Sequence, residues 1–247
     1  MARTPSTEIS TTPPQNKIMR IIDFHSHILA GVDHGSRVLS ESIAQLERIS
    51  ASGTDAVVAT SHFSPYSDKL RAFLEKRERA ISTVAKHIPK GLSVYVGAEV
   101  LLCPGLDRFE ELSDLCIEGT KTLLIEMPTH SWTQELIETL HRIKALGYNV
   151  VIAHLDRYKK ELSARLLDAG FSYQINAGSL YAFGSRRRNR HYLSLEGAVA
   201  LGSDLHGVDG YDAFAHAVKD KKLNASKIMA KTEELLLGAI PITVAEE

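Results

Sequence analysis

The sequence places a ligand-capable side chain at or just after the end of each of seven short apolar runs. His25 and His27 stand one residue apart at the end of the first run, within IDFHSHILAGVDHGS (22–36). Residues two apart on a strand share a face, so both imidazoles are expected to project to the same side. The other runs are followed, in chain order, by His62, Glu99, Glu126, His154, Asn176, and the pair Asp204 and His206.

A mixture of imidazoles and carboxylates suits manganese, iron or zinc at a hydrolytic centre. The candidate ligands exceed the needs of one ion, so two or three divalent ions are expected. Paired ions can activate a water molecule and clamp a phosphoryl group. The alternative is a set of satisfied polar residues without metal, which the regular placement at strand ends disfavours. The candidates are His25, His27, His62, Glu99, Glu126, His154, Asp204 and His206.

The elements that must position these side chains form a regular alternation. Uninterrupted apolar runs of this length are typical of buried parallel strands, and the helical patterns between them predict βαβ crossovers. Seven such units favour a closed barrel over an open sheet, with the ligand candidates at its C-terminal edge. The predicted strands are 20–24, 55–60, 93–98, 122–126, 149–153, 172–176 and 198–202. The predicted helices are 41–52, about 66–88, a segment ending before Gly147, 159–169 and 226–237.

Composition excludes several classes of protein. A net charge of −1 over 247 residues argues against a nucleic-acid-binding surface, and no apolar run approaches the roughly 20 residues that membrane insertion requires. Two cysteines cannot form a disulfide framework, so a reducing cytoplasm is expected. Residues 1–18 are rich in Ser, Thr and Pro and predict a disordered N-terminal extension before a single domain at 19–247. Met19 directly precedes the first strand and is an alternative translation start.

Seven motifs in this order resemble those of the polymerase and histidinol phosphatase (PHP) superfamily. They are IDFHSHILAGVDHG, ATSHF, VGAEV, LLIEMP, VIAHLDRY, QINAGSL and LGSDLHG. Within the superfamily, the chain is most similar to the bacterial manganese-dependent tyrosine-protein phosphatases of capsule and exopolysaccharide loci (the CpsB/YwqE type). The resemblance implies a distorted TIM-like (β/α)7 barrel of PHP type. It also implies a centre of two or three ions, usually manganese, with iron or zinc as alternatives, held by the eight candidate ligands.

The resemblance further implies a metal-dependent protein-tyrosine phosphatase acting on phosphotyrosine proteins. The implied partner is a tyrosine autokinase of polysaccharide export. Arg157 matches the arginine that holds the substrate phosphate, and a guanidinium fits phosphate oxygens bidentately. Asn176 is assigned to substrate binding. Asp204 or His206 would supply a proton to the leaving group, in addition to ligating metal.

The sequence departs from the family pattern at two places. Asp33-His34 stands where the family usually carries two aspartates, so His34 is a candidate ligand without negative charge. Tyr211-Asp212 stands where the family tends to have an arginine, and its loss predicts weaker activity or a changed substrate if that arginine assists phosphate binding. The tract SRRRNR (185–190) predicts a solvated face, or alternatively a surface that attracts an acidic substrate.

The sequence also bears on four other functions. A histidinol-phosphatase-like small-molecule phosphoesterase uses the same machinery and stays open, as does a degenerate barrel that binds metal without turnover. An amidohydrolase or TatD-type nuclease also begins with H-x-H but has no T-S-H after the second strand. A cysteine-based phosphatase is excluded, because only four residues separate Cys103 from Arg108, one fewer than its phosphate loop needs, and no arginine closely follows Cys116.

Overall fold

The computed structural model describes residues 19–129 and 132–243, so the predicted disordered extension at 1–18 lies outside the described residues. The paired strands are all parallel. They are β1 (Ile22–Ser26), β2 (Ala56–Ala59), β3 (His62–Phe63), β4 (Ser93–Val96), β5 (Glu99–Leu101), β6 (Thr122–Glu126), β7 (Asn149–Ile152), β8 (Ser172–Asn176) and β9 (Ala198–Gly202). The helices are α1 (Leu39–Ala51), α2 (Leu70–Val84), α3 (Gln134–Ala145), α4 (Lys160–Asp168), α5 (Arg186–Ser194), α6 (Asp212–Lys219) and α7 (Ala225–Leu235).

The strands form two ladders, β1–β2–β4 and β3–β5–β6–β7–β8–β9. The predicted strand 55–60 is interrupted after Ala59 and continues as β3, and the predicted strand 93–98 is interrupted after Val96 and continues as β5. The two ladders are therefore consecutive parts of one curved sheet. The segment after β9 bridges to β1, because the Asp204 N–H donates to the His25 carbonyl (2.8 Å) and the His27 N–H donates to the Leu205 carbonyl (3.0 Å). The predicted distorted barrel is confirmed.

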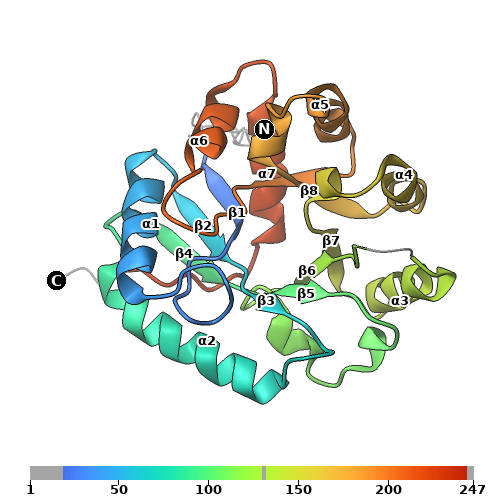
Figure 1. Ribbon diagram of the computed structural model, residues 1–247, viewed down its shortest axis with the longest axis horizontal. Helices are drawn as coiled ribbons and strands as arrows, with labels where there is room; N and C mark the ends of the chain where they lie inside the picture. Colours follow the sequence, from blue (N-terminus) through green and yellow to red (C-terminus); the bar gives the residue numbers. More distant parts are fainter. Residues whose placement is uncertain (1–18, 130–131, 244–247) are drawn as a thin grey trace, which may run out of the picture.

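Helices surround the strands on the outside (Figure 1), and α7 lies against β1 and β9. The strands are therefore covered on both faces, which explains why their sequences are apolar at successive positions rather than at every second one. Each residue of β1 and β2 is buried, and so are all but the last residue of β6 and all but the first of β7 and β8. The buried strands therefore fix where their ends lie relative to one another.

Most predicted helices are present with small shifts at their ends. Helix α1 begins at Leu39 instead of 41, and Val38 rather than Ser40 occupies its N-cap position. The hydroxyl oxygen of Thr133 accepts the Leu136 N–H and caps α3. Helices α5 and α6 were not predicted, and the SRRRNR tract spans the start of α5. Within the described residues, the helices are all too short or too polar to span a membrane.

Candidate metal centre

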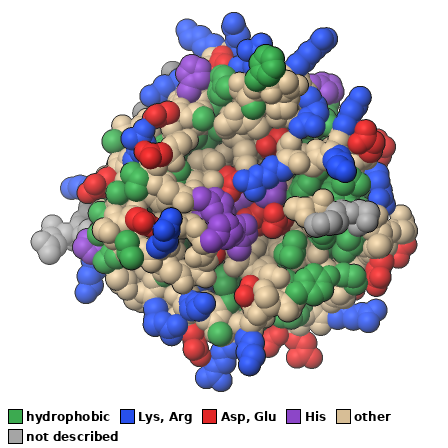
Figure 2. All heavy atoms as spheres, viewed as in Figure 1, with side chains coloured by type: hydrophobic (Ala, Val, Ile, Leu, Met, Phe, Trp, Pro, Cys, Tyr) green, Lys and Arg blue, Asp and Glu red, His purple; other side chains and the backbone are tan. Residues whose placement is uncertain are grey.

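The C-terminal ends of the strands bring all the predicted ligands into one cluster. Strand β1 carries His25, and His27 follows it directly; His62 and Glu99 begin the short strands β3 and β5, and Glu126 ends β6. His154 follows β7, and Asp204 and His206 follow β9. Figure 2 shows a patch of histidine side chains at the centre of this face, with acidic and basic side chains beside it. Four strands and the segments that follow β1, β7 and β9 therefore supply one site.

The innermost group consists of His25, His27 and Glu99, whose side chains are fully buried. The Nε2 atoms of the two imidazoles lie 3.1 Å apart, and Glu99 Oε2 lies 3.1 Å from His25 Nε2 and 3.4 Å from His27 Nε2. Asp204 Oδ1 approaches the same two nitrogens, at 3.7 Å and 3.4 Å respectively. Four ligand atoms thus converge on one point, as they would around a single ion.

Two further groups overlap with the first. His62, Glu99 and Glu126 form one, and His27, His62 and His206 form the other, each with ligand atoms within 4.8 Å of one another. The Nε2 of His154 joins the carboxylates, at 2.6 Å from Glu99 Oε1 and 3.7 Å from Glu126 Oε1. Because Glu99, His27 and His62 each belong to two groups, the arrangement suits neighbouring ions that share ligands.

The donor set fits divalent metal. Asp204 Oδ1 is buried and has no hydrogen-bond partner among the described residues. A buried carboxylate oxygen without a partner is costly, and a cation at the convergence point removes that cost. Imidazole nitrogens mixed with carboxylate oxygens match manganese, iron or zinc better than calcium or magnesium, which prefer oxygen alone. The residues present therefore fit a centre of more than one divalent ion.

The charges in the cluster set the protonation of its members. Burial alone would raise the pKa of Glu99, but His25 and His154 hold it well below its usual range. Burial would likewise raise the pKa of Asp204, yet His25, His27 and Arg157 hold it well below its usual range. Burial and the neighbouring His27 lower the pKa of His206 to about 4. At neutral pH both carboxylates are ionised and His206 is neutral, which are the forms that bind metal.

The backbone is strained where it presents two of the ligands. His154 and Asp204 have φ angles of 34° and 55°, and the only other described non-glycine residue with positive φ is Asn224. Such conformations persist only when the surrounding structure holds them, and they are frequent at functional sites. Gly35 allows another close approach, because a Cβ there would lie 2.3 Å from the His27 carbonyl oxygen. The loop after His27 can therefore fold back against it.

The two adjacent residues Asp33 and His34 have different environments. The Asp33 carboxylate accepts a hydrogen bond from His27 Nδ1 (2.7 Å) and from the His62 backbone N–H (2.8 Å). His34 has an exposed side chain whose ring centroid lies 4.6 Å from that of His62 and 4.8 Å from that of His206. It lies beside the described ligand groups without completing one of them.

Arg157 lies beside the cluster, in the lining of an open pocket. Its side chain is about half exposed (47%), and it forms an ion pair with Asp204. It lines an open pocket together with His34, Phe63, Ser64, Ser67, Asp68, Leu101, and the ligands His62, Glu126 and His206. Asn176 is nearby but mostly buried, and its Nδ2 donates to Asp204 Oδ2 (2.8 Å). The open pocket gives a substrate access to both the metal ligands and the guanidinium.

Tyr211 does not face this pocket. Its side chain is 1% exposed, its hydroxyl lies 3.0 Å from Thr54 Oγ1, and its ring packs against that of Phe214. The position at which the resemblance implies an arginine is therefore part of the core in this chain. The expected loss of a phosphate-binding group at Tyr211 finds no support in this geometry.

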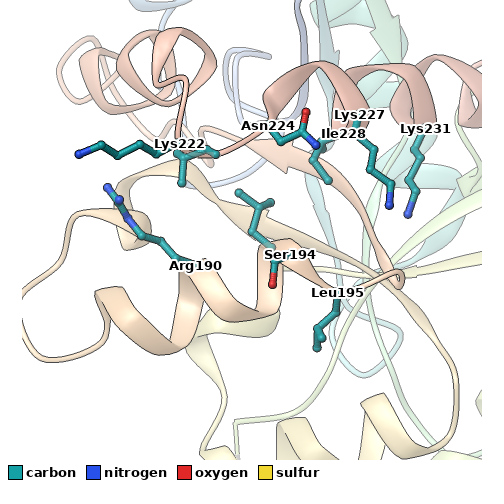
Figure 3. Close-up of a pocket in the computed structure, with 10 residues that line it drawn as sticks. Arg190, Ser194, Leu195, Lys222, Asn224, Lys227, Ile228 and Lys231 are labelled. Atoms are coloured by element: carbon teal, nitrogen blue, oxygen red, sulfur yellow. The ribbon is translucent and has the colours of Figure 1, made fainter.

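The SRRRNR tract also lies away from the cluster. Arg188 donates to the Asp156 carbonyl (2.6 Å), and Arg190 donates to the Leu180 carbonyl (3.0 Å). Arg190 lines a separate basic pocket between α5 and α7, shown in Figure 3, with Lys222, Lys227 and Lys231. Glu196 already pairs with Lys227 and Lys231. The expectation of a solvated face holds only for Arg186 and Arg187, which are exposed.

Two residues behind the cluster were missed by sequence reasoning. Asp33 is an acidic residue six positions after the second histidine of the H-x-H pair, and it accepts a hydrogen bond from that histidine. Gln174 lies within the predicted apolar strand 172–176, and it is fully buried and contacts His25 and His154. The available signal was an amide at an interior strand position on the same face as Asn176.

The fold and the cluster define a class: a parallel α/β barrel with overlapping groups of candidate metal ligands at its C-terminal edge. Residues 21–210 match the family described as "Capsular polysaccharide synthesis, CpsB/CapC". The matched region covers more than half of the chain, and the chain belongs to this family.

Relatives similar to this chain are named as tyrosine-protein phosphatases. Tyrosine-protein phosphatase CpsB of Streptococcus pneumoniae is 29% identical over 231 residues, covering 84% of this chain and 93% of the relative. Tyrosine-protein phosphatase YwqE of Bacillus subtilis is 26% identical over 200 residues, covering 76% and 78%. A solved structure described as one of the metal-dependent tyrosine phosphatases YwqE and CpsB superposes with a TM-score of 0.74. That match has 22% identity and covers 92% of this chain and all of the other.

Proposed function

We propose that this protein is a metal-dependent protein-tyrosine phosphatase. The observation that carries the proposal is the overlap of three ligand groups beside an arginine at the floor of one open pocket. Overlapping groups of this kind hold ions close enough to act on one phosphoryl group, and a guanidinium supplies a complementary fork for its remaining oxygens. The relatives named as tyrosine-protein phosphatases support the same substrate class.

The reaction is hydrolysis of a phosphomonoester. Bound divalent ions would supply Lewis-acid stabilisation of the phosphoryl oxygens and an activated water. His25, His27, His62, Glu99, Glu126, His154, Asp204 and His206 would hold these ions. Arg157 would bind the phosphate and neutralise charge that develops on its oxygens in the transition state. Its ion pair with Asp204 holds the guanidinium at the edge of the pocket.

The leaving group needs little help from an acid. A tyrosine phenol has a reference pKa near 10, so the phenolate is a better leaving group than an alkoxide. Asp204 is ionised and His206 is neutral at pH 7, so neither carries a readily donated proton in this geometry. We therefore assign both residues as ligands in preference to the role of general acid that the sequence suggested.

The proposal also specifies the metal, the phosphorylated partner and the cellular location. Manganese is favoured over iron and zinc because oxygen ligands make up three of the eight donors. The phosphorylated partner in this proposal is a tyrosine autokinase of polysaccharide export, and the family description, capsular polysaccharide synthesis, names the process in which such a partner would act. Two cysteines that are both buried and unpaired are consistent with a cytoplasmic location. We assign His34 to the outer edge of the metal centre. Asn176 is assigned to supporting the ligand Asp204, to which its side chain donates a hydrogen bond.

Phosphate release from para-nitrophenyl phosphate, measured with added manganese and again after chelation, tests the proposal directly. Activity that requires the metal is expected, and no turnover with any divalent ion would leave a degenerate metal-binding barrel. A phosphotyrosine peptide should then be hydrolysed with a higher kcat/KM than histidinol phosphate. The reverse preference would favour the small-molecule phosphoesterase.

A further inference from the structure

A buried glutamine on β8 lies directly behind the metal cluster. Gln174 has no exposed surface, and burying an amide is costly unless its polar atoms are hydrogen-bonded. Both ends of this amide are engaged: Oε1 accepts the His154 backbone N–H at 2.7 Å, and Nε2 donates to Asn176 Oδ1 at 2.8 Å. The amide is therefore held in place from both sides.

The backbone contact determines which way each amide points. The His154 N–H can only donate, so the atom 2.7 Å from it must be the oxygen of Gln174. The Gln174 nitrogen then faces the Asn176 oxygen, and the Asn176 nitrogen faces Asp204 Oδ2 at 2.8 Å. An ionised carboxylate only accepts, so every link in the chain has one donor and one acceptor.

The same oxygen accepts a hydrogen bond from His25. Gln174 Oε1 lies 3.3 Å from His25 Nδ1, and an amide oxygen cannot donate, so Nδ1 carries a proton and donates it. The Nε2 atom of the same ring faces His27 and Glu99, and a bound ion would take the place of the proton that Nε2 donates to the Glu99 carboxylate. A histidine that binds a metal ion through one ring nitrogen keeps the other protonated and hydrogen-bonded in this way.

Gly202 provides an independent observation. It ends β9, next to both Gln174 and His25. A Cβ at position 202 would lie 2.6 Å from Gln174 Nε2 and 2.6 Å from His25 Cβ, distances that real Cβ atoms do not show. The absence of a side chain at this position therefore leaves the space that the glutamine amide and the histidine occupy.

We propose that Gln174 is a positioning residue for the metal centre. It accepts the Nδ1–H of His25, which keeps the Nε2 of that ring facing the cluster, and, through Asn176, it directs an N–H group at Asp204. It therefore contacts one ligand on β1, His25, and reaches a second ligand, Asp204, in the segment after β9. The inference rests on the metal-dependent function proposed above, and it concerns how the chain prepares two ligands before an ion arrives.

Two substitutions at Gln174 separate its two tasks. Gln174→Met keeps the size of the side chain but removes the acceptor and the donor. Loss of a group that orients a ligand typically costs 10–100-fold in metal affinity, so Mn²⁺ binding by calorimetry should weaken by about that factor. Gln174→Glu keeps the acceptor for His25 and should therefore bind Mn²⁺ more tightly than Gln174→Met does.

The Nδ1 hydrogen bond of His25 is read separately, by ¹H–¹⁵N NMR of the metal-free protein. A slowly exchanging Nδ1 proton of His25 should be seen in the wild type and in Gln174→Glu, and it should be lost in Gln174→Met. A retained Nδ1 proton signal together with wild-type Mn²⁺ affinity in Gln174→Met would overturn the proposal. Equal weakening of Mn²⁺ binding in both variants, with that signal unchanged, would also overturn it.

A matched control and a second route keep the test decisive. Gln45 is a fully buried glutamine on α1 whose Oε1 accepts a hydrogen bond from Ser36, and Gln45→Met should lower stability without changing the His25 Nδ1 proton signal or the Mn²⁺ affinity. If Gln174→Met does not fold, Gly202→Ala crowds both the amide and His25, and it should remove the Nδ1 proton signal and weaken Mn²⁺ binding together. An unchanged signal and unchanged binding would contradict the proposal. The Nδ1 proton is measured without metal or substrate, so failure of the phosphatase assay would overturn the proposed function alone.

Discussion

The Asp33 carboxylate lies 2.7 Å from Nδ1 of His27, and this contact leaves the Nε2 of His27 free to face the metal cluster. The same carboxylate accepts the backbone N–H of His62 at 2.8 Å and that of Gly35 at 2.9 Å. Although burial would raise the pKa of Asp33, these hydrogen bonds and the charge of His27 hold it well below its usual range. Asp33 therefore orients one ligand and anchors the strand that carries another.

Asp33→Asn should weaken Mn²⁺ binding by about tenfold or more, because loss of an orienting partner costs 10–100-fold. The asparagine oxygen can replace only one carboxylate oxygen, and its NH₂ group cannot accept a hydrogen bond. Calorimetric titration measures the effect. Asp55→Asn is the matched control, since the Asp55 carboxylate accepts the Ile21 backbone N–H at the opposite end of β1. A tenfold loss in the Asp55 variant as well would show that the effect is not specific to the site.

His34→Asp tests what the residue after Asp33 does. Its ring is exposed and stacks against His62 and His206, so a carboxylate there would add negative charge beside two ligands. An exposed charge of this kind contributes up to about 1 kcal/mol, so Mn²⁺ affinity should rise by roughly threefold, with a parallel rise in phosphatase activity. His34→Ala should change both by less. Loss of activity in both variants would instead make His34 a required ligand.

Much of the barrel was predictable because its strands are covered on both faces. The predicted limits of 122–126, 172–176 and 198–202 coincide with β6, β8 and β9. Helices α5 and α6 were missed for a physical reason. Each buries only three side chains, and most of the apolar periodicity that identifies a helix is absent from the arginine-rich α5.

The ligand cluster was predictable for another reason. In a parallel barrel every strand ends on the same side, so a ligand type repeated at strand ends must converge. The residues behind the ligands were not predictable in this way. Gln174 and Tyr211 acquire their roles from contacts with His25 and Thr54, which lie 149 and 157 residues away along the chain. Sequence spacing carries no information about such contacts.

Arg157→Ala should lower kcat/KM for a phosphotyrosine peptide by at least about tenfold, which corresponds to roughly 1.4 kcal/mol of transition-state binding. Asn176 still donates to Asp204 in this variant, so the metal content should not change. Arg157→Lys keeps the charge without the bidentate fork and should recover only part of the loss. Steady-state kinetics alongside metal analysis measure both quantities. An unchanged kcat/KM would remove Arg157 from phosphate binding.

Tyr211→Phe should lower the free energy of unfolding by about 1 kcal/mol, because it removes the hydroxyl that contacts Thr54. Phosphatase activity should be retained, since Tyr211 is buried in the core and does not line the pocket. Tyr211→Arg restores the residue type that the family tends to carry but buries a charge, and it should destabilise the fold much more strongly. Denaturant unfolding compares the variants. A gain of activity in Tyr211→Arg would show that this position reaches the phosphate.

The buried carboxyl group of Asp23 is expected to make the free energy of unfolding depend on pH. Its side chain is fully buried on β1, and burial raises its pKa from 3.8 to about 6. The folded state therefore favours the neutral carboxyl, and this stabilisation is complete below pH 4 and is lost as the pH rises through 6. The shift corresponds to about 3 kcal/mol. Asp23→Asn cannot ionise, so its stability relative to the wild type should increase between pH 4 and pH 7. Urea unfolding of both metal-free proteins across this range measures the difference, and a constant difference would contradict the assignment to Asp23.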